Sequence, residues 1–209
     1  MRYLKMFGLA AIAATALMAI AGAGSASATV LCSTTADPCP PGQDWPVGIT
    51  LDWSIPAGGS ILQTDTAGKV LNTCKESTVK WTMTKTGSSV ETVTGVDEET
   101  TFGTCTFPTK TLKLANTEIH KIAGTSDGTV TADGVTEITI NSPIFGSCIY
   151  GVPNGASIGE ITEGNPATFH VNAVTQRLGG SGVCPATDKW TATYTLTSPV
   201  NTTLSVSNS

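Results

Sequence analysis

The amino-acid sequence predicts an all-β fold, a single antiparallel β-sandwich or β-barrel domain stapled by disulfides. Three observations predict it. Many short segments alternate apolar and polar residues with a period of two, turn-forming residues separate these segments, and six cysteines are available for cross-links. A segment with period two buries one face and leaves the other in water, which is typical of antiparallel sheets. No segment after residue 28 shows the period of a helix.

Residues 1–28 have the layout of a secretory signal peptide. Arg2 and Lys5 give a positive start, an uncharged apolar run follows, and Ala26-Ser27-Ala28 supplies small residues for cleavage. We therefore expect a secreted protein, extracellular or associated with the cell wall, whose cysteines meet an oxidising environment. No later apolar run approaches the ~20 residues that cross a bilayer, so no membrane span is expected after signal removal.

Residues 29–46 are rich in proline and show no periodic pattern. Proline fixes its backbone angle and lacks an amide donor, which suits neither a helix nor a central strand. We interpret this stretch as an N-terminal arm that precedes an all-β domain spanning residues 47–209.

Alternation marks the strands of that domain. In the segment 49–55 the isoleucines, Leu51 and Trp53 share one face, and in 189–197 the residues Trp190, Tyr194 and Leu196 do the same. Leu114 and Ile119 differ in parity, which predicts a bulge or a turn near residues 115–116. The expected strands lie near 47–55, 60–64, 77–86, 90–102, 109–122, 128–132, 135–141, 147–152, 157–162, 167–177, 188–197 and 202–207.

Turn signals separate these strands. Asp127-Gly128 and Asp133-Gly134 are tight-turn pairs, because glycine accepts a positive φ and aspartate tolerates it. Glycine, proline and asparagine clusters near residues 87–89, 153–155, 163–166 and 179–182 mark further breaks.

Six cysteines allow fifteen complete pairings, and the sequence alone does not choose among them. Neighbouring positions favour three pairs: Cys32–Cys39 within the arm, Cys74–Cys105, and Cys148–Cys184. The spacing contains neither a CxxC motif nor a Cys/His cluster, so we predict structural disulfides and no metal site.

The composition excludes some partners. The formal net charge is −5 and charged residues make up 13% of the chain, about half of the ~25% that is usual in globular proteins. Loss of Arg2 and Lys5 with the leader makes the chain more acidic still. An acidic surface repels phosphate backbones, so we expect no nucleic-acid partner, and we predict no cofactor.

Ser157 lies in the segment Gly155-Ala-Ser-Ile-Gly159, which matches the nucleophile-elbow pattern. The pattern needs a strand before the serine and a helix after it, whereas a turn precedes and a strand follows. His170 comes before Asp188, which reverses the acid–histidine order of such enzymes. We therefore predict no catalytic residues.

Two acidic features invite a metal interpretation. Glu118 and His120 share a strand face, and residues 97–99 read Asp-Glu-Glu. A pair of ligands does not make a metal site, and hard cations require several converging oxygens. We predict that Glu118 and His120 are surface polar residues, and we keep calcium binding at residues 97–99 as a lesser alternative.

The tryptophans divide into two groups. Trp53, Trp81 and Trp190 lie on the apolar parity of their strands and belong to the predicted core. Trp45 lies among prolines, and Trp45 and Tyr150 are the aromatic residues that we nominate as candidate ligand contacts.

Several motifs together resemble a group of secreted proteins. They are the leader and the segments around Cys32, Cys39, Cys74, Cys148-Ile-Tyr150-Gly151, Gly164–Thr168 and Lys189-Trp-Thr191. On these residues the chain resembles an uncharacterised family of exported, disulfide-containing, β-rich proteins of soil actinobacteria. The resemblance implies secretion and a disulfide framework, and it implies no catalytic residue.

These observations lead to one function hypothesis and two alternatives. The first is a secreted, non-catalytic protein with a binding or structural role, whose partner is an extracellular ligand or a component of the cell envelope. One alternative is a carrier for a small apolar ligand held inside a tryptophan-lined barrel. The other is a secreted hydrolase or a hydrolase inhibitor, the inhibitor presenting the disulfide-flanked segment 141–156.

Overall fold

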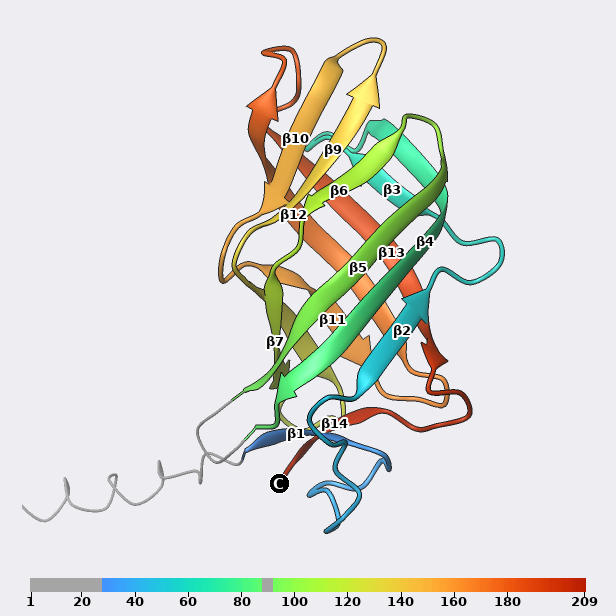
Figure 1. The fold of residues 1–209 in the computed structure, drawn as a ribbon, viewed down its shortest axis with the longest axis vertical. Coiled ribbons are helices and arrows are strands. Elements are labelled where there is room, and N and C mark those ends of the chain that lie inside the picture. The colour runs from blue at the N-terminus through green and yellow to red at the C-terminus, as the bar shows by residue number, and fades with distance from the viewer. Residues whose placement is uncertain (1–27, 88–91) are drawn as a thin grey trace, which may run out of the picture.

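The computed structural model describes residues 28–87 and 92–209, and within them it contains fourteen strands and no helix (Figure 1). Every strand pairing is antiparallel, which confirms the all-β class. The strands are β1 Thr29–Cys32, β2 Thr50–Ser54, β3 Ile61–Thr64, β4 Val70–Lys85, β5 Val93–Cys105, β6 Thr109–Lys113, β7 Asn116–Lys121, β8 Gly128–Asp133, β9 Thr136–Ser142, β10 Gly146–Val152, β11 Ser157–Thr162, β12 Thr168–Gly180, β13 Thr187–Ser198 and β14 Ser205–Asn208.

The sheet closes on itself as a barrel. Around one half of the molecule the pairings form a complete ring in the order β2, β4, β5, β7, β8, β11, β12, β13 and back to β2. A ring of eight strands leaves an interior that side chains nearly fill, or that holds one small ligand. The choice between sandwich and barrel, which the alternation pattern leaves open, is thereby settled as a barrel.

The other half of the barrel reuses the long strands. β3 takes the place of β2 between β4 and β13, and β6, β9 and β10 stand above β7, β8 and β11 in the view of Figure 1. Here the ring is incomplete, because β6 pairs with β9 and is not laddered to β5. One wall of the barrel therefore consists of two stacked groups of short strands between β5 and β12.

Three disulfides staple the fold, and they are the pairs that the spacing favours. Cys74–Cys105 joins neighbouring residues of β4 and β5, Cys148–Cys184 ties β10 to the segment before β13, and Cys32–Cys39 closes a ring after β1. Loops of 31 and 36 residues each contribute roughly 3–4 kcal/mol in the chain-entropy model of cross-links.

A two-stranded sheet of β1 and β14 lies across one end of the barrel (Figure 1). Its side chains Leu31 and Val206 are buried in the core, and the Val206 amide donates to the Ser126 carbonyl in the turn between β7 and β8, at 2.8 Å. This sheet closes the end of the barrel at which β7 and β8 meet.

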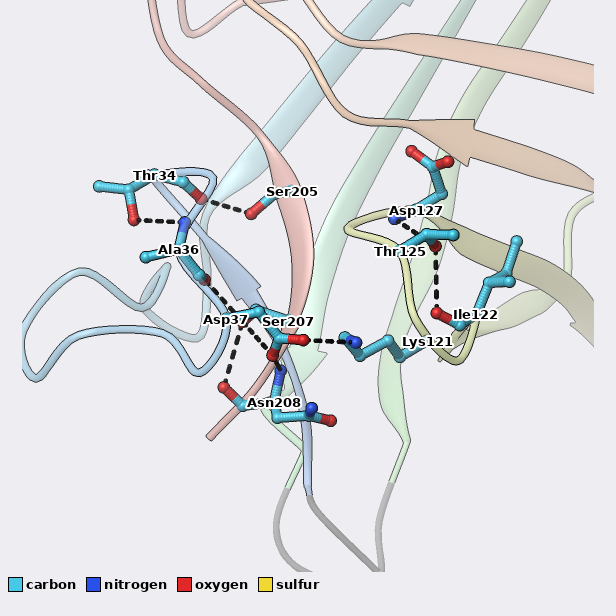
Figure 2. Close-up of polar contacts among 10 residues, drawn as sticks. All are labelled: Thr34, Ala36, Asp37, Lys121, Ile122, Thr125, Asp127, Ser205, Ser207 and Asn208. Atoms are coloured by element: carbon cyan, nitrogen blue, oxygen red, sulfur yellow. Dashed lines mark hydrogen bonds and ion pairs between the residues drawn. The ribbon is translucent and has the colours of Figure 1, made fainter.

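An ion pair fastens the closure (Figure 2). Lys121 Nζ lies 2.7 Å from Asp37 Oδ2, and only 8% of the Lys121 side chain is exposed. Burial raises the pKa of Asp37, but hydrogen bonds from Lys121, the Asn208 amide and the Ser207 hydroxyl outweigh it and hold that pKa below its ordinary value.

Several details differ from the expectations. β1 forms inside the predicted arm, because its partner β14 comes from the far end of the chain. The break at residues 115–116 separates two strands with different partners, β6 on β9 and β7 on β8. β4 begins at Val70, earlier than predicted. The leader up to residue 27 and residues 90–91 of an expected strand lie outside the described residues. In the described part of the chain, no helix has the length and apolarity to cross a membrane.

Candidate functional site

The barrel encloses a cavity of about 70 Å³, measured as the space open to the centre of a water molecule. That is room for on the order of five waters. Its wall is apolar over most of its surface and is built by residues from β2, β4, β5, β7 to β13: Leu51, Trp53, Val79, Trp81, Asp97, Thr100, Thr117, Ile119, Val130, Thr136, Ile138, Val152, Ile158, Ile161, Phe169, Val171, Trp190 and Tyr194. A mostly apolar cavity with few polar groups is the usual form of a small-molecule site.

Asp97 is the acidic residue of this wall, and it shares the inward parity of Val93 and Gly95 in β5. On the β4 partner strand Lys80 pairs with Glu99 and Trp81 pairs with Asp97, so Glu98 is an extra residue in β5. The bulge reverses the parity of β5. Asp97 and Thr100 consequently both line the cavity, whereas Glu98 faces outward to Lys80 at 3.2 Å.

The Asp97 carboxylate has no compensating partner. Among the described residues it makes no hydrogen bond or ion pair, and its pKa is raised to about 7 by burial alone. Asp97 is nevertheless half-buried rather than fully buried. It lines the cavity and keeps part of its surface accessible to solvent. A buried acid with a raised pKa inside an apolar cavity is characteristic of functional sites.

Aromatic rings surround the cavity. Trp81 lies opposite Asp97 in the β4–β5 ladder, so the two side chains stand next to each other on the inner face. The Trp81 indole packs over Gly95, where a Cβ would overlap the ring, and its Nε1 donates to the Thr117 hydroxyl at 2.7 Å. The Trp81 ring is therefore fixed in place beside the carboxylate.

Three further rings of the wall, from β2, β12 and β13, contact one another. Phe169 stacks on Tyr194 with centroids 6.2 Å apart and meets the edge of Trp53 at 6.0 Å. The Tyr194 hydroxyl shares a hydrogen bond with the Ser77 hydroxyl at 3.0 Å. Burial raises the pKa of Tyr194, the nearby Asp97 charge raises it further and the Ser77 hydrogen bond lowers it, so that the phenol stays neutral.

Asp97 lies where the wall of the barrel splits. β5 pairs with β7 only from Val93 to Val96, and its next residues have no strand partner on that side. Further along, a hydrogen bond of 2.7 Å from the Thr111 hydroxyl to the Thr100 carbonyl links β6 to β5. Between these two contacts β5 has no ladder partner on that side within the described chain, and we call this stretch of the wall the seam.

The three residues of the nucleophile-elbow pattern lie in different surroundings. Ser157 is exposed at the start of β11. His170 bonds to Thr168 and Thr193 hydroxyls on the outer face, at 3.1 and 3.2 Å. Asp188 is buried, accepts a short hydrogen bond from Thr175, and its pKa is raised to about 7 by burial. Among the described residues, no hydrogen bond or ion pair joins the side chains of Ser157, His170 and Asp188.

The predicted Glu118–His120 pair exists, with 3.5 Å between Glu118 Oε2 and His120 Nε2, and the same nitrogen lies 3.1 Å from the Thr131 hydroxyl. Within the described residues no group of three or more metal-binding side chains converges there or elsewhere. Of the acidic run 97–99, Asp97 lies on the inner face of β5 and lines the cavity, whereas Glu98 faces outward to Lys80.

The nominated ligand contacts lie outside the cavity. Trp45 packs against the core from the arm, and its amide donates to the Leu31 carbonyl at 2.9 Å. Tyr150 is 1% exposed and donates to the Pro185 carbonyl at 3.2 Å. Neither residue lines the cavity wall. The segment 141–156 is also not one loop, because β10 occupies residues 146–152.

Sequence reasoning missed Asp97 for a definite reason. Asp97 has the inward parity of Val93 and Gly95, but neither glycine nor aspartate marks an inner face in the sequence. In comparisons with protein-family models, curated proteins and solved structures, no match to this chain was found.

Proposed function

We propose that this protein is an exported, non-catalytic binding protein that carries one small, largely apolar molecule inside its barrel. The observation that carries the proposal is the cavity itself, which is surrounded by the strands of the barrel and lined mostly by apolar side chains. Enclosure removes the apolar surface of a ligand from water, which contributes about 25 cal/mol for each Å² buried.

The disulfides support the setting. All six cysteines are paired within the described chain, and such cross-links persist in oxidising compartments. The cavity gives no support to the alternatives of an envelope-coating role and of a hydrolase inhibitor, because neither role uses an internal cavity.

Binding is tested with two variants on one strand. Val171 lines the cavity from β12, whereas Val174 on the same strand is 55% exposed. Val171→Phe fills the interior, so we expect its affinity for a single-ring probe such as benzyl alcohol to fall at least about tenfold, or ~1.4 kcal/mol. Val174→Phe adds the same group outside and is the matched control.

The measurement is a titration followed by tryptophan fluorescence, together with native mass spectrometry of the protein as purified. Trp53, Trp81 and Trp190 line the cavity and report its occupancy. Absence of saturable binding by the wild-type protein, or equal binding by both variants, would refute the carrier function.

A further inference from the structure

The geometry points to a specific class of cargo: a small apolar amine whose protonated nitrogen pairs with Asp97 while its hydrocarbon part fills the aromatic cavity. This inference rests on the proposed carrier function and adds the chemistry that selects the ligand.

The first argument is the unmet demand of the Asp97 carboxylate. A carboxylate held in an apolar interior without hydrogen bonds is costly, and among the described residues none donates to it. A ligand that brings its own donor removes that cost, and a ligand that brings a positive charge also neutralises the site. An anionic ligand would instead place two like charges in the same small space.

The second argument is the composition of the surrounding wall. Five aromatic side chains line the cavity: Trp53, Trp81, Phe169, Trp190 and Tyr194. The faces of such rings attract cations, tryptophan most strongly, and the attraction grows when water is excluded. A carboxylate beside aromatic faces therefore favours a cation over a neutral donor of the same shape.

The third argument is that the protein has made room for this arrangement. Asp97 shares the inner face with Gly95, which leaves space for the Trp81 indole beside it, and the extra residue Glu98 brings Thr100 to the same face. The seam in the wall lies at the same residues of β5. The Asp97 carboxylate, the Trp81 indole and the seam in the strand ladder thus lie at the same stretch of β5.

The charge environment of Asp97 is simple. Tyr194 on β13 is the other titratable side chain among the residues that line the cavity, and it stays neutral. On the neighbouring strand β4, Lys80 faces outward and pairs with Glu98. Titration of the amine preference is therefore expected to follow Asp97 alone.

The test compares four single-ring probes of similar size: benzylamine, benzyl alcohol, toluene and benzoate. At about pH 8.5 both Asp97 and the amine carry their charges, and we expect benzylamine to bind at least about tenfold more tightly than benzyl alcohol. We expect no measurable binding of benzoate. The ratio of amine to alcohol affinity should shrink as the pH falls toward about 5.5, because Asp97 becomes protonated.

Two variants assign the preference. Asp97→Asn keeps the shape of the side chain and removes its charge, so the ratio of amine to alcohol affinity should fall to near one. Glu98→Gln is the matched control, since it removes the adjacent outward charge and should keep the wild-type ratio. A preference that survives in Asp97→Asn would overturn the inference.

The remaining outcomes separate this inference from the carrier function. If benzyl alcohol or toluene binds at least as tightly as benzylamine, the amine assignment is wrong and the carrier function stands. If no probe binds saturably, both are wrong.

Discussion

The Asp97 carboxylate lies in the interior, where no described residue donates a hydrogen bond to it, and this makes the stability of the fold depend on pH. Its pKa is raised from 3.8 to about 7 in the folded protein. Between these values the native state holds a proton that the unfolded chain has released, so stability falls as the pH rises. This contribution is fully present below about pH 4 and is lost as the pH passes through about 7.

Asp97→Asn should remove that part of the pH dependence. We expect the variant to match the wild-type protein at low pH and to be more stable by about 1–4 kcal/mol at pH 8, the upper figure corresponding to about three pKa units. The measurement is urea unfolding of both proteins between pH 4 and pH 8. Asp188, whose pKa is also raised to about 7, will leave a residual slope in the variant. An unchanged profile would mean that water solvates the Asp97 carboxylate in the native state.

Residues whose environment depends on local alternation were predictable, and those that depend on register were not. The inward faces of Trp53, Trp81 and Trp190 follow from period two alone. The inward face of Thr100 depends on a single inserted residue in β5, which is defined only by pairing with β4. In the same way, Trp45 looked like a surface residue among prolines, yet it packs on the core once β1 has found β14.

At the scale of elements, the closing sheet of β1 and β14 depends on its attachment to the barrel. Lys121→Met should weaken that attachment, because it removes an ammonium group that is almost buried and leaves Asp37 without its ion-pair partner. We expect a loss of about 1–2 kcal/mol in the free energy of unfolding.

The matched control for Lys121→Met is Lys80→Met. The Lys80–Glu98 pair has side chains that are 47% and 39% exposed, and pairs of this kind contribute little, so its loss should cost less than about 0.5 kcal/mol. Thermal unfolding of both variants decides the matter. Equal effects would show that the ion pair at Asp37 does not hold the closing sheet in place.

Strand positions could be predicted because alternation is recorded in short stretches of sequence. The three cysteine pairs that form are those favoured by neighbouring positions, although the sequence alone allowed fifteen pairings. Closure of the barrel could not be predicted, since it requires β2 to pair with both β4 and β13, strands more than a hundred residues apart in the chain. The cavity is a further step removed, because it is the volume left over once eighteen side chains from ten strands have packed.

At the scale of the whole molecule, an internal cavity lowers the stability of the fold but leaves room for a ligand. The side chains that line it lose contacts which a filled core would make. Val130, on β8, lines the cavity, so Val130→Ile places one more methylene in free space. We expect the variant to be more stable by about 0.5–1 kcal/mol and to bind benzylamine more weakly than the wild-type protein.

Val206→Ile provides the contrast, because it makes the same change in a filled part of the core. Val206 is completely buried in β14, and a Cβ added at Gly128 would lie only 2.7 Å from its Cγ2. Overpacking there should cost about 1–3 kcal/mol and leave the affinity for benzylamine as it is. Urea unfolding and the benzylamine titration measure both quantities in both variants. If Val130→Ile raised both the free energy of unfolding and the affinity for benzylamine, the ligand would not bind in the cavity. The added methylene takes space from any ligand that occupies it.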